Sequence, residues 1–251
     1  RPARFVLTAA ATWTVLGGTS LARHAAEIAV AVQADDLVTA RRLLPQLVGR
    51  DPSVLDADGI AGAVVESVAE NTSDAVVGAL FWGALAGIPG LLGYRAANTL
   101  DAMVGHHTER YQRFGTAAAR LDDLANLLPA RLTGLLVAGC APLVGGSPVA
   151  ALAAWRRDAA AHPSPNAGVC EAAFAGALGV QLGGQTVYAH RTEQRPVLGA
   201  GRRPEAADVA RAVRLSRAVC YSAAALATAS SLLLGQAAVG AGARVLRRAR
   251  R

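Results

Sequence analysis

The fold is decided by residues 66–101, which read ESVAENTSDAVVGALFWGALAGIPGLLGYRAANTLD. Polar clusters lie at both ends of this stretch, and an uncharged run, residues 75–94, lies between them. A straight span would put the two clusters on opposite sides of a membrane, which a single site forbids. The Gly-Ile-Pro-Gly break at residues 87–90 leaves helical arms of about 15 Å, half the hydrocarbon thickness. The run is therefore predicted to form a kinked or re-entrant hairpin enclosed by protein.

The first polar cluster carries three carboxylates, at Glu66, Glu70 and Asp74. Their i, i+4, i+8 spacing places them on one face of a helix, where like charges about 5–6 Å apart repel each other. Such a stripe beside apolar sequence calls for a cation, and either Mg²⁺ or arginines from another segment would supply it. The alternative is an acidic face that is simply solvated.

The second cluster combines an arginine, an amide and a carboxylate. Arg95, Asn98 and Asp101 (or Thr99) recur every three to four residues and share a helix face. This combination suits a phosphate group together with its metal ion. The alternative is an internal interaction of Arg95 with Asp101 or Thr99 that satisfies a buried polar helix.

Two further clusters follow. Residues 109–131 form a mixed-charge helical segment with Asp122 and Asn126 four residues apart, a pattern more typical of a solvated face. Residues 162–168, His-Pro-Ser-Pro-Asn-Ala-Gly, cannot be helical because prolines fix the backbone and remove donors. A rigid loop of this kind, leading into a helix, can present backbone N–H groups to an anion.

Hydrophobic residues make up 53% of the 251-residue chain and charged residues 17%, below the roughly 25% typical of soluble domains. Besides residues 75–94, the uncharged runs long enough to consider as spans are residues 5–22, 132–155 and 218–243, with a run richer in Gly and Gln at 172–190. We predict an all-α fold, a polytopic membrane helical bundle with kinked or re-entrant helices, in one domain over residues 1–251. The break at residues 145–148 would fold the 132–155 run back. The alternative is a soluble Ala-rich bundle.

Helical periodicity and turn signals place the remaining elements. Helices are expected at residues 5–32, 35–48, 56–72, 95–107, 109–128 and 205–243, with a loop at 198–204.

The chain has a net charge of +7 and contains no lysine. A Walker A loop and a pyridoxal phosphate enzyme both require a lysine, so its absence excludes both classes. No nucleic-acid-binding module is recognisable. Cys140, Cys170 and Cys220 have no metal or redox spacing, and we assign them no role.

Several motifs, taken in order along the chain, resemble one family. They are ESVAENTSDAVVGALFW, YRAANTLDAMVG, ERYQRFGTAAARLDDLANLLPARLT, WRRDAAAHPSPNAG followed by EAAFAGALGVQLGG, and LGAGRRP. From roughly residue 45 to 217 the chain resembles the CobD/CbiB family, the adenosylcobinamide-phosphate synthases of cobalamin (vitamin B12) biosynthesis. The resemblance implies a multi-pass protein of the bacterial inner membrane. The family's opening membrane segment and its early Gly-Asp-Pro stretch are absent, and the chain begins without methionine, so we expect an upstream segment.

The resemblance also implies a reaction. It joins the propionate carboxyl of adenosylcobyric acid to the amine of (R)-1-amino-2-propanol O-phosphate, or of ethanolamine phosphate, with ATP as co-substrate and Mg²⁺ as cofactor. The expected partners are these corrinoid and aminoalcohol-phosphate substrates and the lipid bilayer. A homo-oligomer or an association with other cobalamin-pathway enzymes is also allowed, and no nucleic acid is expected.

Residue chemistry then suggests roles, because phosphoryl transfer needs metal-binding carboxylates and cations, and without lysine the cations must be arginines. Catalytic roles are predicted for Glu70, Asn71, Asp122 and Asn166. Substrate and phosphate binding is predicted for Arg95, Asn98, Arg120, Asn126, Arg131, Arg202 and Arg203. Magnesium binding is predicted for Glu66, Glu70, Asp74 and Asp123.

Two other classes of function are weighed against this one. A non-catalytic membrane sensor or regulator of the same superfamily would have eroded polar clusters, whereas the clusters here are intact. A transporter also uses intramembrane charges and broken helices. Its signature is weaker here, because the polar motifs are concentrated in connecting segments and no inverted repeat is visible.

Overall fold

The structure is a computed structural model that describes residues 2–105, 112–188 and 191–248. Its α-helices are α1 (Pro2–Val15), α2 (Gly18–Gln33), α3 (Leu37–Leu43), α4 (Ala57–Thr72), α5 (Gly78–Val104), α6 (Gln112–Cys140), α7 (Pro148–Asp158), α8 (Ala167–Leu178) and α9 (Ala206–Arg248). Shorter helical turns cover Leu44–Gln46, Ser73–Val77, Ala141–Val144 and Ala159–Ala161. An antiparallel hairpin is formed by β1 (Leu182–Tyr188) and β2 (Arg191–Leu198).

The predicted all-α fold is confirmed. Within the part of the chain that the structure describes, three stretches are helical, long and apolar enough to cross a membrane, namely Phe5–Gln33, Ala57–Val104 and Gly115–Val144. The β hairpin was not predicted. The suggestion that residues 172–190 form a membrane span is wrong. α8 ends at Leu178 because Gly179 adopts a left-handed conformation (φ 70°) that caps the helix, and the chain then enters β1.

Most of the other predicted elements are confirmed, with small shifts at their ends. Asp36 caps α3 by accepting the N–H of Thr39, and Asp56 caps α4 by accepting that of Gly59. The first expected helix, residues 5–32, is instead two helices. Between them Gly17 donates its N–H to the carbonyl of Ala75 (3.2 Å). This bond ties the break to the start of the hairpin. Residues 106–111, which include the start of the third polar cluster, lie outside the described residues.

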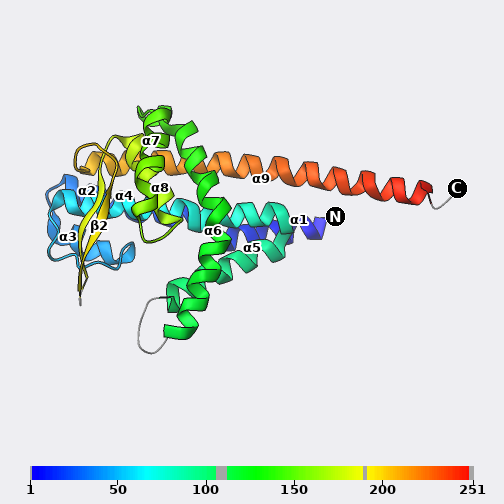
Figure 1. Cartoon of the computed structure of the whole chain (residues 1–251), viewed down its shortest axis with the longest axis horizontal. Helices are drawn as coiled ribbons and strands as arrows, with labels where there is room; N and C mark the ends of the chain where they lie inside the picture. Colours follow the sequence, from blue (N-terminus) through cyan, green and yellow to red (C-terminus); the bar gives the residue numbers. More distant parts are fainter. Residues whose placement is uncertain (1, 106–111, 189–190, 249–251) are drawn as a thin grey trace.

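α5 turns back on itself, as predicted from its Gly-Ile-Pro-Gly break. Gly87 has φ 66° and ψ −151°, a combination essentially restricted to glycine. The two arms pack so closely that a Cβ placed on Gly78 would lie 2.3 Å from the ring of Tyr94. Figure 1 shows the two arms side by side, next to α1. The polar clusters before and after the apolar run therefore meet.

The second break also reverses the chain, as predicted. α6 ends at Cys140, Gly145 adopts φ 70°, and Ser147 caps α7 by accepting the N–H of Ala150 (3.3 Å). α7 then packs against α6, where the ring of Trp155 approaches Gly134.

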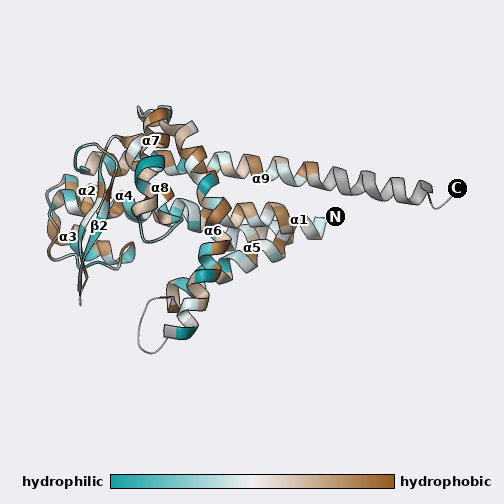
Figure 2. Ribbon diagram, in the orientation of Figure 1, coloured by the Kyte–Doolittle hydropathy of each residue, from teal (hydrophilic) through white to brown (hydrophobic). Residues whose placement is uncertain are grey.

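Apolar side chains on α1 are exposed rather than buried. Phe5 is 76% exposed and Trp13 is 85% exposed. Burying such a side chain is worth about 1.5–3 kcal/mol, so lipid around α1 accounts for these residues better than a soluble bundle does. α1, the α5 turn and the distal half of α9 project to the same side of the molecule (Figure 1), and apolar residues dominate α1 and α5 there (Figure 2).

Candidate functional site

An acidic cavity of about 460 Å³ opens where α4, α5, α8 and β2 converge. Five carboxylates and two arginines line it. They are Glu66, Glu70, Asp74, Asp101 and Glu171, with Arg50 and Arg195. Because carboxylates outnumber arginines, the cavity attracts cations and repels bare anions.

Glu70 and Asp74 line this cavity from successive turns of one helical segment. Asp74 belongs to the π-helical turn Ser73–Val77 that follows α4, and such turns are frequent at functional sites. Glu70 is exposed, and none of the described residues forms a hydrogen bond or ion pair with its carboxylate. Asp74 accepts a long hydrogen bond (3.4 Å) from Asn98. Asn71 also lines the cavity, and its amide donates to the carbonyl of Ser67 (2.9 Å).

A network of amides and carboxylates joins the α5 hairpin to α6. Asn98 donates to one oxygen of Asp122 (3.2 Å), and Asn126 donates to the other (3.0 Å). Tyr94 donates its hydroxyl to Asn126 (2.7 Å), and Arg95 donates to Asn98 (3.1 Å). Leaving a buried polar group unpaired costs about 1–3 kcal/mol, so this network stabilises the packing of the hairpin on α6. Of these five residues, only Asn98 lines the acidic cavity.

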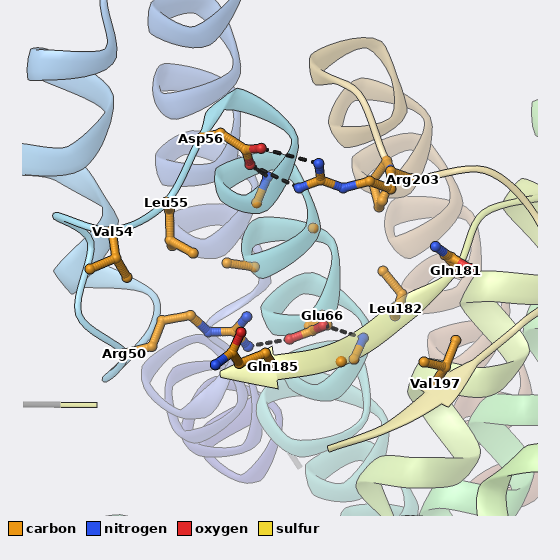
Figure 3. Close-up of a pocket in the computed structure, with 16 residues that line it drawn as sticks. Arg50, Val54, Leu55, Asp56, Glu66, Gln181, Leu182, Gln185, Val197 and Arg203 are labelled. Atoms are coloured by element: carbon orange, nitrogen blue, oxygen red, sulfur yellow. Dashed lines mark hydrogen bonds and ion pairs between the residues drawn. The ribbon is translucent and has the colours of Figure 1, made fainter. Parts of the chain in front are cut away.

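Glu66, predicted as a metal ligand, is already paired. Its carboxylate forms an ion pair with Arg50 and accepts the N–H of Gly183 (2.8 Å) from β1. Figure 3 shows this pair in the wall of a second cavity, of about 420 Å³, that is bounded elsewhere by an ion pair between Asp56 and Arg203. Arg50 and Glu66 line both cavities. They therefore separate the two cavities and anchor the β hairpin to α4.

Three other predicted residues form a group between α6 and the start of α8. Arg131 donates to Asn166 (2.7 Å), and Asn166 donates to the carbonyl of Asp123 (2.8 Å). Asp123 does not line the acidic cavity. The four predicted metal ligands are therefore not assembled in one place.

The predicted phosphate-binding arginines Arg120, Arg202 and Arg203 also lie away from the acidic cavity. Arg120 is exposed on α6. Arg203 makes two hydrogen bonds to Asp56 (2.9 and 3.1 Å). Arg202 binds Asp208 (2.8 Å). Arg202 and Arg203 therefore hold the start of α9 rather than presenting free guanidinium groups.

Asp208 shows how strongly the start of α9 is held. Burial opposes its ionisation, yet hydrogen bonds from the N–H of Glu205 (2.9 Å), from Arg202 and from Arg211 (2.8 Å) lower the pKa of Asp208 below its ordinary value. The carboxylate is completely buried.

Three charged residues of the acidic cavity were not assigned from sequence: Arg50, Arg195 and Glu171. Arg195 reaches the cavity from β2, which only the tertiary fold reveals. Glu171 left a signal, because it is the charged residue in the otherwise apolar helix α8 and an isolated buried charge is costly. Burial, reinforced by Glu66 and Glu70, raises the pKa of Glu171 well above its ordinary value.

Two of the four predicted magnesium ligands are placed to hold such an ion. Among the described residues, no three His, Cys, Asp or Glu side chains could enclose a metal ion by themselves. Mg²⁺ in enzymes is usually held by one or two carboxylates together with water and substrate phosphates. Glu70 and Asp74 suit that pattern, because among the described residues neither forms an ion pair with an arginine. Glu66 does not, because it pairs with Arg50, and Asp123 does not, because it lies outside the cavity.

The predicted anion site at the start of α8 is already filled by the protein. Ser164 accepts the N–H groups of Asn166 (3.3 Å) and Ala167 (3.2 Å) through its hydroxyl, and that of Gly168 (3.4 Å) through its carbonyl. The loop is non-helical from His162 to Asn166, as predicted, but Ala167 and Gly168, also predicted to be non-helical, form the start of α8.

Comparison with known proteins identifies the family. The model of the CobD/Cbib protein family matches residues 2–216. The chain is 61% identical over 220 residues to the cobalamin biosynthesis protein CobD of Mycobacterium tuberculosis, covering 88% of this chain and 70% of that protein. It is 50% identical over 206 residues to the protein of the same name from Rhodobacter capsulatus (82% and 64% covered), and 46% identical over 230 residues to that from Chromobacterium violaceum (92% and 72% covered).

No solved structure matches the chain. The family match spans most of the sequence and includes every residue that lines the acidic cavity. The chain therefore belongs to the CobD/CbiB family of cobalamin biosynthesis proteins.

Proposed function

We propose that this protein forms an amide bond in cobalamin biosynthesis. It joins adenosylcobyric acid to (R)-1-amino-2-propanol O-phosphate, or to ethanolamine phosphate, at the expense of ATP, and yields adenosylcobinamide phosphate. Membership of the CobD/CbiB family supports the pathway. The observation that carries the reaction is the acidic cavity, which Glu70 lines without a hydrogen bond or ion pair to any residue that the structure describes.

The chemistry explains why such a cavity is useful. A carboxylate is a poor electrophile, so an amine attacks it only after activation. In the proposed sequence the corrinoid carboxylate takes the γ-phosphoryl group of ATP and ADP leaves. The amine then attacks the acyl carbon, phosphate leaves, and the amine nitrogen gives up a proton. Phosphoryl transfer depends almost entirely on positioning and on neutralising the phosphate charge.

Glu70 and Asp74 are the residues proposed to hold Mg²⁺. The ion, when bound with the nucleotide, would supply the positive charge that lets phosphate groups enter a cavity with five carboxylates. Arg50 and Arg195, which also line the cavity, add positive charge. Asn71 presents an amide group that can orient a polar group of the corrinoid, whereas Asn98 already donates both amide hydrogens, to Asp74 and Asp122.

We also propose that the protein is a multi-pass protein of the bacterial inner membrane, with the lipid bilayer as a partner. The three apolar helical stretches and the exposed aromatic residues of α1 support this location. The acidic cavity lies away from the turn of the α5 hairpin, so polar reactants can reach it from water.

The test is an assay of the detergent-purified protein with adenosylcobyric acid, aminopropanol phosphate and MgATP, following the amide product. Glu70→Gln removes the proposed metal-binding charge and should lower the rate by about a hundredfold or more, as expected when a group that stabilises transition-state charge is lost. Glu27→Gln is the matched control, because Glu27 is exposed on α2 and, among the described residues, its carboxylate pairs with His24 alone. Full activity of Glu70→Gln would refute the role of Glu70, and absence of product from the wild type would refute the reaction.

A further inference from the structure

A third cavity, of about 410 Å³, has the opposite charge. It lies between α6, α7 and the loop that precedes α8. Its lining is Arg131, Trp155, Arg156, Ala159, Ala160, His162, Pro163, Pro165 and Val169. None of these residues is acidic, so this basic cavity favours an anion where the acidic cavity repels one.

Its two arginines are available to a ligand to different degrees. Arg156 is exposed, and among the residues that the structure describes it has no hydrogen-bond or ion-pair partner. Arg131 uses one terminal nitrogen, Nη1, for Leu127 (3.1 Å) and Asn166 (2.7 Å). The rest of its guanidinium remains to donate. Arginine is the side chain best suited to phosphate, because its planar donors match the phosphate oxygens.

His162 lines the basic cavity and lies next to a residue of the acidic one. The imidazole is 5% exposed, and Nδ1 accepts the N–H of Ser164 (3.1 Å). Nε2 is buried and has no hydrogen-bond partner among the described residues. The nearest carboxylate oxygen, on Glu171, lies 3.8 Å from it, and Glu171 lines the acidic cavity. The His162 and Glu171 side chains, one from each cavity lining, are therefore neighbours.

We propose that the basic cavity binds the phosphate group of a phosphomonoester, with Arg156 and Arg131 as its ligands. This inference rests on the proposed function, which has two phosphate-bearing reactants. A nucleotide brings its own Mg²⁺ and can enter the acidic cavity. A phosphomonoester that arrives without a metal ion carries close to two negative charges at neutral pH and needs arginines instead. The basic cavity offers them next to the proposed reaction site.

The same phosphate chemistry could come from an anionic lipid headgroup, because the apolar segments of the protein suit a membrane. The experiment therefore has two arms. In the first, binding of ethanolamine phosphate to the full chain in detergent is measured by calorimetry, without corrinoid or nucleotide. In the second, the measurement is repeated in nanodiscs of zwitterionic lipid and in nanodiscs containing phosphatidylglycerol.

The test variant is Arg156→Gln and the matched control is Arg157→Gln. Arg157 is the next residue of α7, is similarly exposed and does not line the cavity. Loss of a charge-assisted hydrogen bond should weaken binding to Arg156→Gln by about tenfold or more. Arg157→Gln should bind like the wild type. Equal affinity of both variants and the wild type would overturn the proposal, and so would an equal loss in both variants, because that would indicate unspecific attraction.

The second arm identifies the source of the phosphate. One outcome is that ethanolamine phosphate is bound more weakly in phosphatidylglycerol nanodiscs than in zwitterionic ones. If this difference between the two lipids disappears in Arg156→Gln and persists in Arg157→Gln, a lipid headgroup competes for the same phosphate site. Unchanged binding would mean that the site serves the soluble ester. Binding is measured without turnover, so Arg156-dependent binding with no amide product would refute the proposed function alone. Amide synthesis that is indifferent to Arg156→Gln, with no Arg156-dependent binding, would refute the phosphate site alone.

Discussion

Gly87→Ala tests the hairpin on which the whole site depends. Gly87 has φ 66° and ψ −151°. A residue with a side chain held in such a conformation is strained by about 1–3 kcal/mol. Crowding adds nothing to that figure, because the nearest atom to a Cβ at this position, Cδ of Pro89, is 4.0 Å away. The substitution therefore measures backbone strain alone.

Gly93→Ala in the second arm of α5 is the matched control. A Cβ there would have no atom within 4 Å, and the backbone is helical. Replacing a helical glycine by alanine stabilises a helix by about 0.5–1 kcal/mol. The two variants should thus differ in free energy of unfolding by about 1.5–4 kcal/mol, with opposite signs relative to the wild type.

The assay is reversible unfolding of the purified protein in mixed micelles with increasing sodium dodecyl sulfate, followed by circular dichroism. Gly87→Ala should unfold at a lower detergent fraction than the wild type, and Gly93→Ala at an equal or higher one. If Gly87→Ala were as stable as Gly93→Ala, the chain could pass residue 87 in an ordinary helix. The reasoning that places the two polar clusters together would then be wrong.

Three further predictions concern the packing of the hairpin arms, the buried Asp208 and the side of the membrane on which the polar clusters lie. Gly78→Ala should displace the Tyr94 ring, because its Cβ would lie 2.3 Å from that side chain, and should destabilise the protein by about 1–3 kcal/mol in the same unfolding assay. Asp208→Asn should cost about 3–5 kcal/mol at pH 7, where the buried carboxylate is paired. Because the pKa of Asp208 is lowered by folding, its stabilisation is present above the unfolded pKa of about 3.9 and is lost as the pH falls through the folded value. Unfolding measured from pH 7 to pH 3 should show the gap between wild type and variant narrowing only below about pH 4. Cysteines introduced at Asp74 and Arg95, in a chain without its native cysteines, should react with a membrane-impermeant maleimide from the same side, whereas labelling from opposite sides would refute the hairpin.

The hairpin could be predicted from sequence because two independent signals agree. Charged clusters at both ends of residues 75–94 require the ends to meet, and the glycines and proline in the middle allow the chain to turn. The same reasoning succeeded at residues 145–148. At both places a local backbone feature determines a long-range contact, so the local sequence is sufficient.

The prediction of a membrane span at residues 172–190 failed for a physical reason. α8 is as apolar as a membrane segment, but it is buried by α4, α6, α7 and the β hairpin. Hydropathy measures the preference to leave water and does not distinguish lipid from protein as the new surroundings. The strands that follow contain two glycines, Gly183 and Gly184, and Pro196, which weaken their strand signal.

Only some of the residues that line the acidic cavity were predicted, namely those from the polar clusters at the two ends of the hairpin. Glu70, Asn71 and Asp74 lie within two helical turns of each other and line the cavity, and the predicted hairpin adds Asn98 from its second arm. Arg50 and Arg195 arrive from a loop and from β2, and no local pattern fixes their distance from Glu70. The same limit explains Arg202 and Arg203, whose basic motif suggested phosphate although the fold supplies carboxylates to both.

The position of the hairpin explains how a membrane-embedded chain can offer a polar site. Asp74 and Asn98 are 24 residues apart, which in a straight helix corresponds to about 36 Å, more than the thickness of the hydrocarbon core. In the structure their side chains are 3.4 Å apart, because the chain reverses at Gly87 and both arms return to the same end. The apolar turn and α1 then point one way (Figure 1). The acidic cavity is lined by residues at the root of the hairpin and by Arg195 of β2. A re-entrant hairpin thus contributes residues from both of its ends to one cavity without carrying any of their charges across the bilayer, a cost that a straight span could not avoid.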